Sequence, residues 1–118
     1  MDKVLSTLTQ IIDAGNKILL YTRDISEEEF AEDEIKQYAI QRLFEIMGEG
    51  CSRLPTDILE DCAEMPCKGL KDLRNVLIHR YDVVDLIILW NTIKMDLPGI
   101  IRSVQDCMDQ QKTKFSKK

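Results

Sequence analysis

Apolar side chains recur along this chain at steps of three and four residues, the spacing that places them on one face of an α-helix. The first such stretch runs from about Lys3 to Tyr21 and predicts an amphipathic helix. A second helix is predicted after Ser26, because a serine followed by three glutamates is a favourable N-cap with acids in the first turn. This helix is expected to continue to about Arg53.

The second helix carries two stripes of side chains, one apolar and one polar. The apolar stripe consists of Ile35, Ala39, Leu43, Ile46, Met47 and Gly50, and the polar stripe consists of Tyr38, Arg42, Glu45, Glu49 and Ser52. Two shorter helices are expected in the segments PTDILEDCAEMP and CKGLKDLRNVLIHR. The first of these is expected to be capped by Thr56 and to stop before Pro66.

The last long helix is predicted to follow an Asp82 cap and to be nearly apolar all round in its first turns. A helix that buries a single side does not require apolar residues all round. We therefore expect one side of this helix to face the core and the other to face a second subunit. Pro98 is expected to kink this helix, and residues 110–118 are expected to form a frayed basic tail. The pattern as a whole predicts one all-α domain over residues 1–118. We expect an antiparallel bundle of three long helices and one or two short ones, assembled as a two-fold homodimer.

Composition narrows the classes of function. The formal charge of −5 and the pI of about 4.9 exclude a globally basic surface for nucleic acid, so any contact with RNA must be local. The four cysteines lack CxxC spacing and there is one histidine. We therefore predict no metal site and no cofactor, and expect reduced, mostly buried thiols. The chain shows neither a signal peptide nor an apolar run of ~20 residues, so a cytoplasmic protein without membrane contact is expected.

The groups able to carry chemistry gather in the short stretch LRNVLIHRYD, which holds the single histidine. On a helix of about 100° per residue, Arg74, Asn75 and His79 share one face. The apolar positions on the other face are Leu70, Leu73, Val76 and Leu77. Arg80 would enter the apolar face if the helix continued, so the helix is expected to end near His79 and to release Tyr81 into the following turn.

An imidazole beside a guanidinium can cleave a phosphodiester without a metal. Histidine titrates near neutral pH, so His79 can take a proton from a ribose 2′-hydroxyl or give one to the leaving oxygen. Arg74 stays charged and can hold the phosphate oxygens in the transition state, and Asn75 can fix the histidine tautomer or bind the phosphate. Acid–base cleavage uses two proton-handling groups, and a two-fold dimer with the site at its axis would supply the second histidine.

Three stretches, in order, resemble the HepT-like toxins of the HEPN superfamily. LRNVLIHRYDVVD resembles their signature of arginine, four residues, histidine, one residue and tyrosine. GEGCSRLP is similar to their Gly-Glu-Ala stretch ending in Leu-Pro, and LWNTIKMDLP is similar to their closing helix. The resemblance covers about residues 37–104 and implies a helical-bundle dimer with a metal-independent ribonuclease site in the cleft between protomers. Arg74 and His79 match the catalytic pair, and Asn75 matches the polar residue after the arginine.

The resemblance also implies a partner. HepT-like toxins of type VII toxin–antitoxin systems are encoded beside a small nucleotidyltransferase of the MNT type, the antitoxin, which transfers AMP to the motif tyrosine. Tyr81 holds that position. Two positions depart from the family pattern: Cys67 stands where tryptophan is frequent, and Arg80 stands where glycine is frequent. The first change concerns local packing and the second concerns the choice of substrate.

Glu49, Lys71 and Arg80 are candidate supporting residues. Glu49 either orients Arg74 or His79 or is a surface glutamate. Lys71 either joins a basic rim for RNA, with Arg53 and Lys68, or belongs to an ordinary solvated helix face. Arg80 either adds a phosphate contact or narrows access to Tyr81. The alternative function is a non-catalytic helical subunit that binds the nucleotidyltransferase and presents a substrate to it. The acidic pI favours this alternative, and the intact motif favours the ribonuclease.

Overall fold

The computed structural model describes residues 2–80 and 84–116, and every regular element in these ranges is a helix, which confirms the all-α prediction. The elements in chain order are α1 (Asp2–Thr22), α2 (Glu27–Glu32), α3 (Glu34–Arg53), α4 (Thr56–Asp61), α5 (Cys67–His79), α6 (Leu86–Asn91), the π-helical turn η2 (Thr92–Asp96) and α7 (Leu97–Ser116). None of the helices in these ranges is both long enough and apolar enough to cross a membrane.

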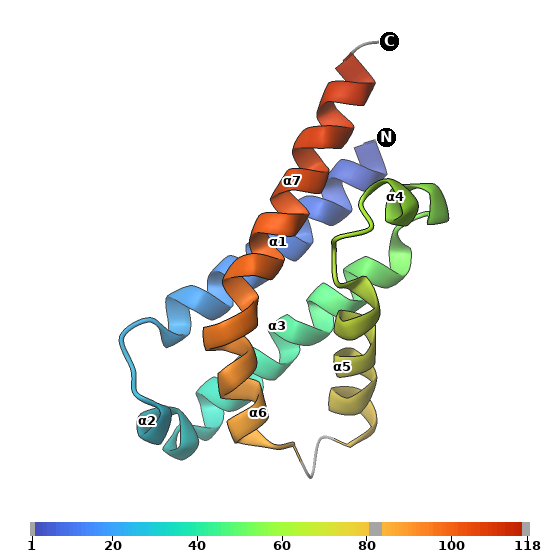
Figure 1. The fold of residues 1–118 in the computed structure, drawn as a ribbon. Helices are drawn as coiled ribbons and strands as arrows, with labels where there is room; N and C mark the ends of the chain where they lie inside the picture. Colours follow the sequence, from blue (N-terminus) through green and yellow to red (C-terminus); the bar gives the residue numbers. More distant parts are fainter. Residues whose placement is uncertain (1, 81–83, 117–118) are drawn as a thin grey trace.

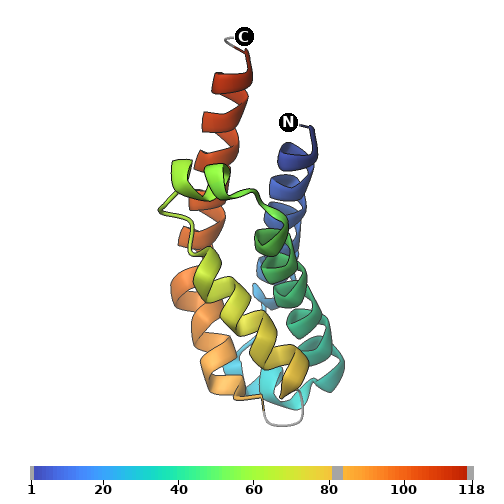
Figure 2. The ribbon, with the colours of Figure 1, turned by 90° about the vertical axis from the view of Figure 1, so that its right-hand side faces the viewer.

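Three long rods form the bundle, as expected: α1, α3 and the continuous run from α6 through η2 to α7 (Figure 1). Helix α3 packs against α1 on one side and against α5 on the other, and α1 also packs against α7. The view in Figure 2 shows α5 lying along α3, with the described ends of α1 and α7 at the same end of the molecule. Helix α5, which carries the signature, is therefore held mainly by α3.

The core is centred on α1 and α3. Leu8, Ile11 and Ile18 of α1 are fully buried, as their spacing predicted. On α3 Met47 and Gly50 are buried as expected, but Ile40 and Phe44 are buried with them in place of Ile35, Ala39, Leu43 and Ile46. Ile35 is 83% exposed, and the other three are only partly buried or at the margin of the core. The buried face is displaced because α3 is enclosed by α1 and α5 together, a contact that the pattern of one helix does not reveal.

The predicted second helix is interrupted at Asp33. Ser26 caps α2 as expected, since its Oγ accepts a hydrogen bond from the Glu29 N–H at 3.1 Å and the Glu29 carboxylate accepts one from the Ser26 N–H at 2.9 Å. Asp33 then ends α2 and caps α3, because its Oδ1 accepts a hydrogen bond from the Lys36 N–H at 3.0 Å. A second N-cap therefore divides one predicted helix into two.

The last rod begins later than predicted and widens before Pro98. Asp85 caps α6 by accepting hydrogen bonds from the N–H groups of Ile87 and Ile88, whereas Asp82 lies outside the described residues. At the predicted kink, η2 closes with a hydrogen bond from the Leu97 N–H to the Thr92 carbonyl. Proline has no N–H and its ring clashes with the preceding turn, so this wider turn accommodates Pro98 within a continuing helix.

The four cysteines form two disulfides, so the prediction of reduced thiols is wrong. Cys51 of α3 pairs with Cys67 at the start of α5, and Cys62 after α4 pairs with Cys107 of α7. The partners are 16 and 45 residues apart. Their pairing follows from how the helices pack, which explains why no short cysteine motif announced it.

The expected frayed tail is helical as far as Ser116. Gln111 is buried, and its amide donates a hydrogen bond to the Asp61 carboxylate at 3.3 Å. The Lys114 ammonium also pairs with Asp61. These contacts attach the end of α7 to α4, so the polar composition of the segment misled the prediction.

Candidate active site

Helix α5 carries the signature and ends where the sequence predicted. Its last helical residue is His79, and the N–H of Arg80 closes the final turn by donating to the Val76 carbonyl at 2.8 Å. Leu70 and Leu77 are buried. Val76, which was expected on the buried face, is 49% exposed. The inward side of α5 is thus narrower than predicted.

The three signature residues within the described range reach solvent. Asn75 and His79 are exposed, and Arg74 is partly exposed. The guanidinium of Arg74 donates through Nε and Nη2 to Oδ1 of Asn75, at 3.2 and 2.9 Å, and through Nη1 to Oγ of Ser52 at 3.1 Å. A guanidinium has five N–H donors, so two remain for a ligand. Both protein partners are neutral, which leaves the charge of Arg74 uncompensated by these contacts.

Gly48 of α3 provides the seat for Arg74. A Cβ at Gly48 would lie 2.6 Å from Cβ of Arg74 and 2.6 Å from the carbonyl oxygen of Leu70. Real Cβ atoms do not approach so closely, so the missing side chain allows α5 to lie directly against α3. The sequence had indicated that the glycines beside Glu49 permit a close helix approach. Gly48 meets α5, whereas Gly50 meets Ile11 of α1.

Ser52 is the site residue that the sequence analysis missed. Its hydroxyl donates to the Gly48 carbonyl at 3.2 Å and accepts from Arg74 at 3.1 Å, so it joins the seat to the guanidinium. The available signal was its place on the polar stripe, one helical turn after Gly48. Nothing in the sequence showed that this stripe borders α5.

Glu49 contacts Arg42, and not Arg74, the arginine that one of its two interpretations paired with it. Its Oε1 accepts a hydrogen bond from Nη1 of Arg42 at 3.1 Å, and Glu45 accepts one from the same nitrogen at 3.2 Å. The hydrogen bonds with Glu49 and then with Glu45 raise the pKa of Arg42 above its ordinary value. In the described residues no hydrogen bond joins Glu49 to Arg74 or to His79. Glu49 is therefore part of an ion-pair network along α3.

The remaining candidates lie around the exposed side of α5. Lys71 is partly exposed and Arg80 is exposed, whereas Lys68 pairs with Asp72 at 3.2 Å. Arg53 donates to the Gln10 side chain at 2.7 Å and so faces α1. Of the suggested basic rim, only Lys71 is without such a contact among the described residues; Arg80, a separate candidate, lies just beyond the end of α5. Tyr81, the expected AMP acceptor, lies outside the described residues.

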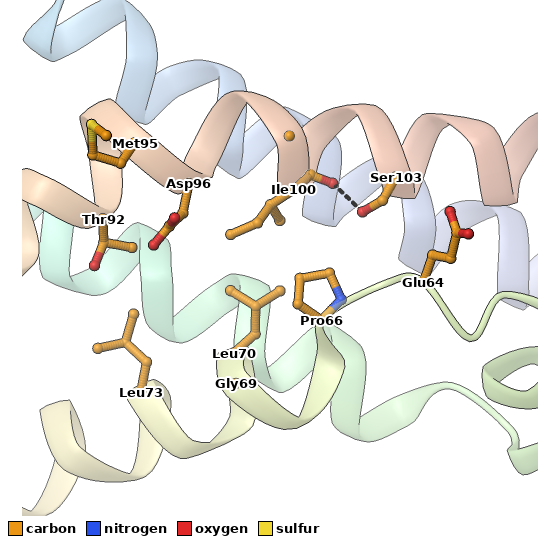
Figure 3. Close-up of a pocket in the computed structure, with 11 residues that line it drawn as sticks. Glu64, Pro66, Gly69, Leu70, Leu73, Thr92, Met95, Asp96, Ile100 and Ser103 are labelled. Atoms are coloured by element: carbon orange, nitrogen blue, oxygen red, sulfur yellow. Dashed lines mark hydrogen bonds between the residues drawn. The ribbon is translucent and has the colours of Figure 1, made fainter.

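A groove runs between α5 and the η2–α7 rod, on a different side of α5 from Arg74. Figure 3 shows Leu70 and Leu73 of α5 facing Thr92, Asp96 and Ile100 across it, with Glu64 and Ser103 toward one end. Its volume is about 540 Å³ and its lining includes none of the signature residues Arg74, Asn75 and His79. Since its floor is aliphatic and its charged lining residues are carboxylates, the groove lacks the cation and the imidazole that phosphate chemistry needs. The candidate site is therefore the open surface around Arg74 and His79.

The sequence is similar to those of known proteins. The model of the Ribonuclease HepT-like family matches residues 11–107. "Putative RNase MJ1380" of Methanocaldococcus jannaschii is 36% identical over 98 residues, which are 83% of this chain and 90% of that protein. "Probable ribonuclease HepT" of Thermococcus cleftensis is 37% identical over 93 residues, 79% of this chain and 84% of that protein. "Putative RNase TTE0752" of Caldanaerobacter subterraneus subsp. tengcongensis is 30% identical over 105 residues, 89% of this chain and 94% of that protein. No solved structure matches significantly.

Proposed function

The chain belongs to the HepT-like ribonuclease family, and from this we propose that it is a metal-independent endoribonuclease, the toxin of a toxin–antitoxin pair. Arg74 and His79 would carry the reaction, and Asn75 would hold the guanidinium. The observation that carries the proposal is the state of Arg74. Its guanidinium is held by two neutral groups, reaches solvent and keeps two N–H donors for a phosphate.

The proposed reaction is transesterification at the RNA phosphate. Neutral His79 accepts the proton of the ribose 2′-hydroxyl, and the 2′-oxygen forms a bond to phosphorus while the bond to the 5′-oxygen breaks. A protonated second histidine gives its proton to the leaving 5′-oxygen, so the products are a 2′,3′-cyclic phosphate and a 5′-hydroxyl. Arg74 binds the phosphate oxygens as negative charge develops on them.

We propose a two-fold homodimer as the source of the second histidine. Leu89 and Trp90 of α6 are buried, whereas Ile87 is 62% and Ile88 is 59% exposed. Ile88 lines a hollow that it shares with Val76 and Arg80 of the α5 end. A second copy that covered this apolar surface would remove it from water and would bring the two His79-bearing helix ends near one axis.

A cognate MNT-type nucleotidyltransferase is the proposed antitoxin, with Tyr81 as acceptor of AMP. The support is the spacing of Tyr81 from Arg74 and His79 in the sequence. AMP on Tyr81, two residues beyond the end of α5, would bring a negatively charged phosphodiester to the mouth of the site and compete with RNA for Arg74. The alternative, a non-catalytic subunit that binds the nucleotidyltransferase, is favoured only by the acidic pI.

The test measures cleavage of a labelled RNA by the purified chain in the presence of EDTA. We expect His79→Ala and Arg74→Ala to abolish cleavage and growth arrest while the dimer persists in sedimentation. Full cleavage by a folded, dimeric His79→Ala would contradict the proposed chemistry. For the antitoxin, co-expression with the nucleotidyltransferase should add one or more adenylyl units to the intact mass, and Tyr81→Phe should prevent the gain.

A further inference from the structure

The surroundings of Arg74 pose an electrostatic problem. Glu49 directly follows the seat of Arg74, Gly48, and Ser52, the acceptor for Arg74, lies one turn beyond Glu49. Side chains three residues apart on a helix are neighbours, with Cβ atoms roughly 5–6 Å apart. The Glu49 carboxylate is therefore within reach of the Arg74 guanidinium. A carboxylate and a guanidinium form strong, frequently bidentate pairs, yet the structure shows neutral partners on Arg74.

Arg42 holds the competing carboxylate. Its Nη1 lies 3.1 Å from Oε1 of Glu49 and 3.2 Å from Oε1 of Glu45, so one guanidinium engages both acids of the stripe. Glu45 and Glu49 are only 20% and 33% exposed at the side chain, whereas Arg42 is 58% exposed. Arg42 thus lies over the two carboxylates and holds them along α3.

The register of the two helices places this network beside the site. Cys51 is bonded to Cys67 and Gly48 contacts Arg74, so α3 and α5 run in opposite directions. Arg42 lies six residues before Gly48, and His79 lies five residues after Arg74. At a rise of ~1.5 Å per residue, both lie roughly 8 to 9 Å along the helices from the Gly48 contact. Arg42 and His79 are therefore at the same level.

We propose that Arg42 is a positioning residue for Arg74: by holding Glu49, together with Glu45, it keeps the carboxylate off Arg74 and leaves that guanidinium free for an RNA phosphate. This inference rests on the proposed function. It assigns to Arg42 an effect that acts through Arg74 and not through substrate contact. Without Arg42, Glu49 pairs with Arg74, cancels its charge and occupies the N–H donors that face solvent.

The first experiment compares kcat/KM for RNA cleavage by Arg42→Gln, Glu49→Gln and the double variant Arg42→Gln/Glu49→Gln. An exposed guanidinium–carboxylate pair contributes up to about 1 kcal/mol, so Arg42→Gln is expected to cleave about fivefold more slowly. The double variant is expected to return to within about twofold of the original protein, because the freed carboxylate is gone. Glu49→Gln alone is expected to cleave at least as fast as the original. Arg23→Gln, which removes an arginine paired with Asp24 elsewhere on the surface, controls for the change in net charge.

A slow double variant would overturn the inference, because a merely structural role of Arg42 is not rescued by removing Glu49. Unchanged cleavage by Arg42→Gln would overturn it as well. A second measurement does not depend on RNA: the Nε–H resonance of Arg74 in an NMR spectrum, assigned by its loss in Arg74→Lys. We expect it to shift in Arg42→Gln and to return in the double variant. If it does so while no variant cuts RNA, the inference about Glu49 stands and the ribonuclease proposal fails. A resonance unmoved by Arg42→Gln refutes the inference even if the original protein cuts RNA.

Discussion

Gly48→Ala offers a direct test of the seat on which Arg74 rests. The new Cβ would lie 2.6 Å from Cβ of Arg74 and 2.6 Å from the Leu70 carbonyl oxygen, so α5 would have to move away from α3. Both atoms lie on or next to the backbone and cannot rotate aside. We therefore expect the free energy of unfolding to fall by about 3 kcal/mol, the upper end of the cost of overpacking a core. Alanine regains about 1 kcal/mol through its better helix propensity. The net loss of about 2 kcal/mol corresponds to a Tm lower by about 8 °C in a chain of this length.

The assay is thermal unfolding followed by circular dichroism, with Gly69→Ala as matched control. Gly69 lies on α5, and a Cβ there meets nothing within 4 Å, so the same substitution is expected to leave Tm unchanged or to raise it. Gly48→Ala should also lose more RNA cleavage than its Tm explains, because Arg74 leaves Ser52. A Gly48→Ala protein as stable as the Gly69→Ala control would refute the close approach of α5 to α3.

Three further predictions follow from contacts elsewhere in the fold. Cys62→Ser removes the disulfide between residues 45 apart, and Cys51→Ser removes the one between residues 16 apart. Loop entropy predicts that the free energy of unfolding falls by about 4 kcal/mol in the first variant and by about 3 kcal/mol in the second, as measured by urea unfolding without reductant. A larger loss in Cys51→Ser would contradict the loop argument. The Lys114 ammonium holds the pKa of Asp61 below its ordinary value. The ion pair therefore stabilises the folded protein fully above about pH 4, and this stabilisation is lost as the pH falls through the lowered pKa of Asp61. The Tm gap between the original protein and Asp61→Asn should accordingly close in strong acid, and a gap independent of pH would count against the ion pair. Ile88→Lys places a charge on the exposed apolar surface of α6 and is expected to yield folded monomers in analytical ultracentrifugation; dimers of unchanged affinity would exclude this surface as the interface.

The helices of this fold could be predicted from the sequence because each is governed by local rules. The spacing of Leu8, Ile11 and Ile18 gave the inward side of α1, and the clash of Arg80 with the apolar face gave the end of α5 at His79. Both are properties of a few consecutive residues. The Asp33 cap was equally local, but the glutamates on either side of it favour a continuous helix and concealed it.

The features that escaped prediction depend on which helices meet. The register of α3 against α5 brings Ser52 to Arg74, and one sequence does not contain that register. The packing of α7 against α4 likewise pairs Cys107 with Cys62 and buries Gln111. The signature residues were found from the sequence because they share one helix, whereas the groups on α3 that hold and protect Arg74 were not.

The two disulfides overlap along the chain, because Cys62 lies inside the loop closed by Cys51 and Cys67, and Cys107 lies outside it. A protease that cuts one peptide bond anywhere between residues 51 and 107 therefore leaves two fragments that remain covalently joined. A cut between α5 and α6, next to Tyr81, would leave α3 and α5 on one fragment, so Arg74 would keep its seat, and the Cys62–Cys107 bridge would hold the fragment that contains α7. Nicked protein of this kind would migrate as one species until a reductant is added, and it would retain the half of the site that α3 and α5 build together.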